Sequence, residues 1–253
     1  MIKVQQLTFG YVVDQPVFSD FNWQVDKGDS WTILGPSGCG KSTLLYLLAG
    51  LQQPISGRIL IDGEQLFRPR PQSGLIIQDY GLLPWATVRE NVALGFNIRR
   101  FYGPDGTHAP SQCLIRTEDI DYWIQQLGLW EQKDKFPGQI SGGQRQRCAI
   151  ARTLVLQPDL LLMDEPFSSL DAPTRENLQN LMIELWDTHD LTMVTVTHSI
   201  EEAAILGQKI LLLQSPPNKA AHVIENASFG RKEVRSDPDY LQLCQVLREQ
   251  MTI

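Results

Sequence analysis

Hydrophobic residues follow two patterns along this chain. Partial alternation of apolar and polar positions over residues 2–9 and 17–25 predicts two antiparallel strands. Continuous apolar runs predict buried strands, and two of these runs are apolar enough to lie inside a parallel sheet that is covered on both faces. The runs cover residues 31–34 and 74–78 and, for the parallel sheet, 159–163 and 192–197. The pattern therefore predicts an α/β fold with an antiparallel segment at its start.

The pattern becomes helical over residues 84–156. Candidate helices lie at 88–94 and 120–129, and the Gly- and Pro-rich residues 99–116 between them predict an exposed loop. A polar tail follows two consecutive prolines and predicts a strand and a final helix, over residues 222–225 and 238–249.

Composition narrows the class of protein. The chain has 253 residues, of which 42% are hydrophobic and 20% charged, as in an ordinary globular protein with room for one large α/β unit. The net charge of −7 argues against a general nucleic-acid-binding surface, and we expect no nucleic-acid partner. No apolar run approaches the ~20 residues that span a bilayer, and residues 1–5 do not begin a signal peptide. The scattered cysteines form no C-x-x-C pair and predict reduced thiols, without a disulfide framework or zinc site: Cys39, Cys113, Cys148 and Cys244.

A glycine-rich loop between a predicted strand and a predicted helix carries the first chemical signal. It fits G-x-x-x-x-G-K-[ST], in which backbone N–H groups and a helix N-terminus bind phosphates. Lys41 would reach the β- and γ-phosphates, the Ser42 hydroxyl would bind Mg²⁺, and Cys39 would be a small filler. The alternative is a glycine-rich turn that matches by chance. The loop consists of Gly35, Pro36, Ser37, Gly38, Cys39, Gly40, Lys41, Ser42 and Thr43.

Further polar residues follow the other buried strands. Asp164 and Glu165 end one apolar run, where Asp164 would bind Mg²⁺ and Glu165 would activate or orient the attacking water. A structural alternative, in which the acid caps the next turn, is open for Asp164 alone. His198 follows the next strand, at the edge where open α/β sheets bind ligands, and favours a γ-phosphate contact. Gln78, also just past a strand, is a candidate ligand of Mg²⁺ or water.

The segment Ser141-Gly142-Gly143-Gln144 predicts a second anion-binding helix start. Ser141 can cap the helix, and the two glycines leave N–H groups open to an anion. Because the chain already has a phosphate loop around Lys41, this second start suggests a contact with a nucleotide held by another copy of the chain. The alternative is a plain Ser-capped helix whose glycines only permit close packing.

Taken together, these motifs resemble the ATP-binding subunits of ABC transporters, and the likeness covers nearly the whole chain. The resemblance identifies Gly35 to Thr43 as Walker A, Gln78 as the Q-loop and Ser141 to Gln144 as the signature, preceded by Ile140 where leucine is usual. It further implies that Tyr11 stacks on adenine, that Leu160 to Glu165 is Walker B, that Ser168 to Asp171 is the D-loop and that His198 is the switch histidine.

The implied fold is a RecA-like P-loop NTPase core with an antiparallel β subdomain and an α-helical signature subdomain. We expect a single ABC domain over residues 1–253: a core with the β subdomain at 1–83 and 157–215, a helical subdomain at 84–156, and a C-terminal extension at 216–253. The family uses ATP and Mg²⁺ in a dimer in which each ATP lies between the Walker A loop of one copy and the signature of the other.

A finer resemblance points to bacterial importers of the nitrate, sulfonate and taurine type. It rests on the segment from Leu82 to Val92 with its Leu-Pro-Trp, on Thr197 to Ala203, and on Arg235 to Pro238. It implies a peripheral position on the cytoplasmic side of the cell membrane, a permease partner that contacts the region of Gln78 and Trp85, and indirectly an external solute-binding protein. For Leu82 to Trp85 a buried hydrophobic turn is the alternative. For the whole chain the alternatives are a soluble ABC-type ATPase that is not coupled to transport, and a non-enzymatic scaffold.

Overall fold

The computed structural model describes residues 1–12, 14–111, 116–231 and 234–251. Its contacts divide the chain into two compact units. The first unit comprises residues 1–69 and 181–253, and the second comprises residues 70–180. Helix α5 (Ala172–His189) runs from one unit into the other. The division into core, helical subdomain and C-terminal extension expected from the sequence stays a prediction.

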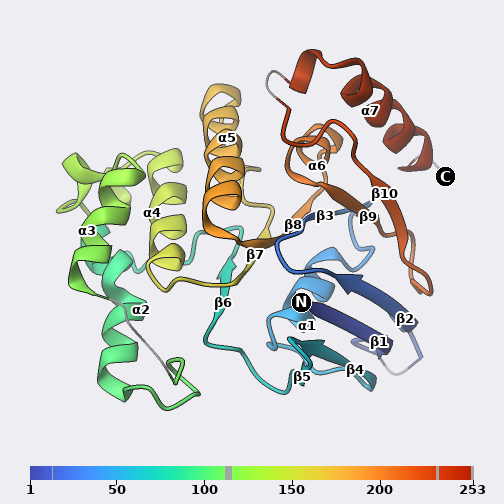
Figure 1. The fold of residues 1–253 in the computed structure, drawn as a ribbon, viewed down its shortest axis with the longest axis horizontal. Helices are drawn as coiled ribbons and strands as arrows, with labels where there is room; N and C mark the ends of the chain where they lie inside the picture. The colour runs from blue at the N-terminus through green and yellow to red at the C-terminus, as the bar shows by residue number, and fades with distance from the viewer. Residues whose placement is uncertain (13, 112–115, 232–233, 252–253) are drawn as a thin grey trace. The chain divides into compact units, whose positions relative to one another are not determined.

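An antiparallel sheet in the first unit has the strand order β2-β1-β4-β5 (Figure 1). Its strands are β1 (Ile2–Phe9), β2 (Phe18–Val25), β4 (Ser56–Ile61) and the two-residue β5 (Glu64–Gln65). In β2 the apolar residues Phe21, Trp23 and Val25 are buried, whereas the polar residues between them are exposed. The alternation seen in the sequence therefore predicted the buried face of this sheet correctly.

The first unit also contains strands in the order β10-β9-β3-β8. They are β3 (Ser30–Leu34), β8 (Thr192–Thr197), β9 (Lys209–Leu212) and β10 (His222–Glu225). Strand β3 pairs in parallel with β8 and β9, and β10 is antiparallel to β9. Every residue of β3 and β8 is buried, as the continuous apolar runs predicted. Helix α6 (Ile200–Leu206) contacts β3 and β8, α1 (Lys41–Leu48) contacts β8, and α7 (Pro238–Met251) contacts α6.

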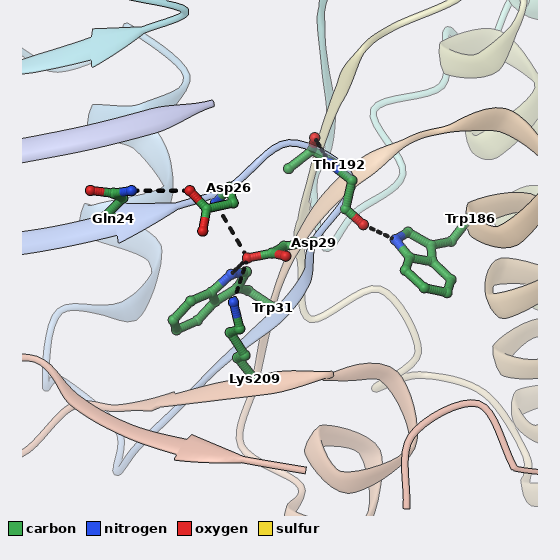
Figure 2. Close-up of polar contacts among 8 residues, drawn as sticks. Gln24, Asp26, Asp29, Trp31, Trp186, Thr192 and Lys209 are labelled. Carbon is green, nitrogen blue, oxygen red and sulfur yellow. Dashed lines mark hydrogen bonds and ion pairs between the residues drawn. The ribbon is translucent and has the colours of Figure 1, made fainter. Parts of the chain in front are cut away.

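A polar cluster fixes the amino end of β3 (Figure 2). The Asp29 carboxylate accepts hydrogen bonds from Trp31 Nε1 and Lys209 Nζ, each at 3.0 Å. The bond to Asp29 also raises the pKa of the Lys209 ammonium. Gly28 N donates to Thr192 Oγ1 at 3.0 Å, which ties the same end of β3 to the start of β8. These contacts hold β3 at one end, while the glycine-rich loop leaves it at the other.

The second unit combines two parallel strands with helices (Figure 1). Strand β6 (Ser73–Ile76) pairs with β7 (Leu160–Asp164). Helix α4 (Gly142–Leu154) contacts β6, α2 (Val88–Tyr102) and α3 (Thr117–Gln126). A Cβ on Gly74 would collide with the Thr153 side chain, so this glycine permits the close approach of α4 to β6. Short 3₁₀ turns lie at Trp130–Gln132, Pro137–Gln139 and Val234–Ser236.

Helix α2 is longer than its sequence pattern predicted. It continues past residue 94 to Tyr102 and takes in the first residues of the predicted loop 99–116. The physical reason is Arg99, which is buried and donates hydrogen bonds to the carbonyl oxygens of Leu156 and Pro71. The helix ends at Gly103, whose φ is 72°. Residues 112–115 of that predicted loop lie outside the described residues.

Helices α5 and α6 and strands β5 and β9 were not predicted from the sequence. In the described part of the chain, no helix is long and apolar enough to cross a membrane.

Candidate nucleotide-binding and catalytic site

The glycine-rich loop connects β3 to α1, as the sequence predicted. Gly35 follows the last residue of β3, and a Cβ there would collide with the Leu213 carbonyl oxygen. Gly40 is the N-cap of α1 in a left-handed conformation with φ 107°, and a glycine at this position offers no side-chain oxygen to the first-turn amides. A helix start of this kind can bind an anion, because the first N–H groups of a helix have no acceptors within the helix.

Lys41 is folded back over this loop. The residue is only 7% exposed, and its Nζ donates to Gly35 O at 2.8 Å and to Pro36 O at 2.9 Å. Cys39 is buried in the same loop, and burial raises the pKa of its thiol. A neutral, buried thiol agrees with a filler and disfavours a nucleophile. Asn218 Nδ2 donates to Cys39 O at 2.8 Å and supports the loop, while the Asn218 backbone pairs with Phe18 at the start of β2.

Tyr11 lies beside the start of α1. It is 64% exposed, its ring meets the Phe9 ring edge-on at 5.1 Å, and its hydroxyl is 3.2 Å from Thr43 Oγ1. An exposed aromatic ring next to the phosphate loop is compatible with stacking on a base. The adenine-stacking role of Tyr11 stays a prediction.

The register of the parallel strands places His198 at the same edge of the sheet as the glycine-rich loop, at the carboxyl ends of the strands. Leu34 of β3 pairs in parallel with Thr197 of β8, so Gly35 and His198 follow paired residues at the carboxyl ends of neighbouring strands. His198 is exposed. Its neighbours are anchored, because Ser199 N donates to Thr197 Oγ1 at 3.1 Å and the Ser199 hydroxyl caps α6. Ligands of open α/β sheets bind at this edge.

The second unit shows the same arrangement at β6 and β7. Ile76 pairs in parallel with Met163, so Gln78 lies just past the carboxyl end of β6, while Asp164 ends the adjacent strand β7 and Glu165 follows it. Asp164 is 5% exposed. Glu165 is half-buried, has φ 45°, and its carbonyl accepts a hydrogen bond from the Ser168 hydroxyl at 3.1 Å. Glu165 therefore lies at the start of a tight turn directly after β7.

The predicted signature forms the start of α4. Ser141 Oγ accepts from Gln144 N at 3.3 Å, and Gln144 Oε1 accepts from Ser141 N at 2.9 Å, which completes a capping box. Ser141 is exposed. The two glycines differ: a Cβ on Gly143 would collide with the Thr174 side chain, whereas one on Gly142 would meet nothing closer than 3.7 Å. Close packing explains Gly143 but not Gly142.

Asn91 organises the Leu-Pro-Trp turn and was missed by the sequence reasoning. This fully buried residue of α2 accepts from Leu83 N at 2.8 Å and donates to Ala86 O at 2.9 Å and Thr87 O at 3.0 Å. The turn leaves Trp85 74% exposed, so the alternative of a fully buried hydrophobic turn is wrong for this residue. A polar residue among the apolar positions Val88, Val92 and Phe96 was the signal that could have found Asn91.

Comparison with known proteins decides the family. The model of the ABC transporter family matches residues 18–168, which include the phosphate loop, the signature and Walker B. The chain belongs to the ABC transporter family. It is an ATP-binding subunit of that family, an ABC transporter ATPase with the cassette fold.

Two relatives of this ABC subunit are named as import ATP-binding proteins. It is 41% identical over 210 residues to the aliphatic sulfonates import ATP-binding protein SsuB of Bacillus cereus, covering 83% of this chain and 78% of SsuB. It is 38% identical over 242 residues to the taurine import ATP-binding protein TauB of Pseudomonas aeruginosa, covering 92% and 88%.

A solved structure of the cassette MJ0796 in a dimeric post-hydrolysis state with ADP and Pi has a TM-score of 0.73 to this chain. The identity is 28%, with 89% of this chain and 98% of that one covered. The α/β cassette fold expected from the sequence, with an antiparallel part and parallel strands, is thus confirmed.

Proposed function

We propose that this ABC ATPase powers a bacterial-type importer, which takes up a small solute of the nitrate, sulfonate or taurine class through a separate permease. The observation that carries the ATPase part is the glycine-capped start of α1 beside a buried lysine: Gly40 is a left-handed N-cap without a side chain, and Lys41 Nζ donates to Gly35 O in the same loop. The import names of SsuB and TauB support the transport part.

Phosphate binding exchanges partners that the loop already has. Lys41 Nζ leaves the carbonyl oxygens of Gly35 and Pro36 for phosphate oxygens, while the first-turn N–H groups of α1 donate to the same phosphates. The remaining loop residues supply backbone donors, and Tyr11 offers an exposed ring to the base. These proposed ATP-binding residues are Tyr11, Gly35, Pro36, Ser37, Gly38, Cys39, Gly40, Lys41, Ser42 and Thr43.

Hydrolysis needs a base, a sensor of the terminal phosphate, and a cation. We assign the role of the base to Glu165, which takes a proton from water or orients it, and the role of the sensor to His198, which contacts the γ-phosphate. Ser42, Gln78 and Asp164 together offer hydroxyl, amide and carboxylate oxygens, the donor types that suit Mg²⁺. When bound there, Mg²⁺ would neutralise charge on the phosphates.

A second copy of the chain completes each site in this proposal. The Ser141 helix start of one copy would meet the ATP held by the Lys41 loop of the other, with Ser141, Gly142, Gly143 and Gln144 in contact. The exposure of Ser141 and the open space at Gly142 support this role. The dimeric MJ0796 cassette supports a dimer as well.

Trp85 supplies the proposed contact with the permease. An indole that is 74% exposed, on a turn held by the buried Asn91, suits an apolar protein partner. The subunit would lie peripherally on the cytoplasmic side of the membrane, and the external solute-binding protein and the permease would select the solute. The net charge of −7 gives no support to a nucleic-acid partner.

Glu165→Gln tests the ATPase assignment. Loss of a general base lowers rates by about 100-fold or more, while ATP binding persists, so ATP-bound dimer should accumulate. Phosphate release and size-exclusion chromatography with ATP measure both effects. Hydrolysis at the parent rate would disprove the role of Glu165.

Co-purification tests the transport assignment. The tagged chain, expressed with its neighbouring permease, should retain an integral membrane protein in mild detergent, and Trp85→Ala should weaken that retention. Full ATPase activity without any membrane partner would favour the soluble ABC ATPase instead.

A further inference from the structure

Tyr80 lies at the junction of three motifs of the second unit. It follows Gln78 by two residues and adopts φ 60°, and the next residue, Gly81, has φ 59°. The Tyr80 hydroxyl is 2.6 Å from Ser169 Oγ. The Tyr80 carbonyl accepts from Arg152 at 2.7 Å, and the Arg145 guanidinium lies 5.9 Å from the centre of the ring.

These partners belong to the other motifs. Arg145 and Arg152 are both in α4, the helix that begins at the signature. Ser169 belongs to the turn that starts at Glu165, where Ser168 N donates to Glu165 O at 3.3 Å and Leu170 N donates to Phe167 O at 3.2 Å. Tyr80 therefore connects the loop of Gln78 with α4 by its carbonyl and with the Glu165 turn by its hydroxyl.

Packing alone does not account for this arrangement. Tyr80 is half-buried and Ser169 is exposed, so their hydrogen bond competes with water and stabilises the fold little. A non-glycine residue in the left-handed region is strained, and such strain gathers at functional sites. Arg152 compensates for it by donating to the carbonyls of both Tyr80 and Gly81.

We propose that Tyr80 is a positioning residue for ATP hydrolysis. Through Ser169 it holds the turn that carries Glu165, and it ties the orientation of that turn to the loop of Gln78 and to α4. The proposal deepens the function proposed above and rests on it. It assigns a role to the contact between the hydroxyl groups of Tyr80 and Ser169.

The test removes each hydroxyl of the pair in the full chain. Tyr80→Phe and Ser169→Ala should each lower kcat for ATP about fivefold, equivalent to about 1 kcal/mol in the barrier. The KM for ATP should stay within about twofold, because phosphate binding does not use this contact. The double variant should lose no more than either single variant, since both changes break one contact.

Two further variants serve as controls. Tyr122→Phe removes the hydroxyl of a tyrosine in α3 of the same unit, 47% exposed with its ring against Trp123, and should leave kcat unchanged. Ser169→Thr keeps a hydroxyl and should restore most of the activity that Ser169→Ala loses. Thermal midpoints of Tyr80→Phe and Ser169→Ala close to that of the parent would exclude a loss of folded protein as the cause of the lower kcat.

Parent kcat in either Tyr80→Phe or Ser169→Ala would overturn the proposal. So would multiplied losses in the double variant, or a rise in KM that matches the fall in kcat. Glu165→Gln, measured in parallel, separates a failure of the proposed catalytic site from a failure of the role proposed for Tyr80. If Glu165→Gln keeps the parent rate, the proposed catalytic site is wrong, whereas a dead Glu165→Gln beside an active Tyr80→Phe refutes only the role of Tyr80.

Discussion

The helices α1 and α4 both begin at glycine-rich segments, yet their first turns differ. At α1 the N-cap is Gly40, which is left-handed and has no side chain with which to cap the helix. At α4 the N-cap is Ser141, which exchanges two hydrogen bonds with Gln144. The α1 start therefore receives no cap from its N-cap residue, whereas the α4 start has one first-turn amide, that of Gln144, bonded to its N-cap side chain.

This difference separates two roles for a phosphate contact. An anion at α1 meets a helix start at which the N-cap glycine has no side chain to compete with it, together with the Lys41 ammonium. An anion at α4 finds one amide already bonded to Ser141, and Arg145 already donating to Ile140 O at 2.7 Å. We expect α1 to provide the affinity for ATP and α4 only the additional contact that favours closure of the dimer.

The largest expected effect comes from α1. Lys41→Ala removes charge-assisted hydrogen bonds worth about 1.5–3 kcal/mol each, so ATP affinity should fall about 100-fold. Lys27→Ala is the matched control, because its exposed ion pair with Asp190 lies away from the loop, at the amino end of β3. Calorimetric titration with ATP checks both. Parent affinity in Lys41→Ala would remove the distinction between the helix starts.

Substitution of the two glycines at the start of α4 should have smaller effects, on turnover for Gly142 and on stability for Gly143. Gly142→Ala should lower turnover at least about tenfold by blocking access to an N–H donor. Its thermal midpoint should hold or rise, because Ala favours helix over Gly by about 1 kcal/mol and the added methyl meets no close neighbour. Gly143→Ala should instead lower the midpoint, and Gly143→Ala combined with Thr174→Ser should recover it.

If a stable Gly142→Ala variant had the turnover of the parent, the proposed contact of the α4 start with ATP would be wrong, and this helix start would serve only as a capped helix end. Phosphate release and thermal unfolding of all three variants decide the matter.

Two equivalent capping boxes sharpen the comparison further. Ser141→Ala and Thr87→Ala each remove the N-cap of a box, at α4 and α2, and each should lower the free energy of unfolding by about 1 kcal/mol. Only Ser141→Ala should also reduce turnover, about fivefold, while monomer ATP affinity stays unchanged. Urea unfolding, ATP titration and phosphate release measure the three quantities. Equal loss of turnover in both variants would assign the effect to stability.

The smallest effect is the pH dependence of the α2 box. Hydrogen bonds from Thr87 N–H and Oγ1–H lower the pKa of Glu90 below 4.5. The box therefore stabilises the fold above the ordinary pKa of glutamate and loses this contribution as the pH falls through the folded-state pKa. The α4 box, with Gln144 in the same position, does not titrate. Urea midpoints between pH 7 and pH 3 should fall less in Glu90→Gln than in the parent.

Much of the fold was readable because the signals are local. Strand β8 (Thr192–Thr197) and strand β10 (His222–Glu225) occur where their runs predicted them, and α4 starts at the predicted Ser141 cap. Helix α5 was missed although it is 18 residues long. Its apolar residues alone did not reveal which side it buries.

The candidate site divides in the same way. The order of the motifs identified the family. The phosphate loop could be identified from its residue types, because its phosphate-binding residues are contiguous in the sequence. The two glycines of the signature remained ambiguous in the sequence, because Thr174, which distinguishes them, lies on another helix.

The sequence by itself determined the α/β class, the capped and uncapped helix starts and the ABC motifs, because hydrophobic period and capping act within a few residues. Tertiary structure decided how far α2 extends, which glycine is needed for packing, and where the Tyr80 hydroxyl bonds. Those outcomes depend on partners far along the chain: Arg99 bonds a carbonyl 57 residues away, and Tyr80 bonds a hydroxyl 89 residues away. No local pattern records such a partner, because folding alone brings the two groups within reach.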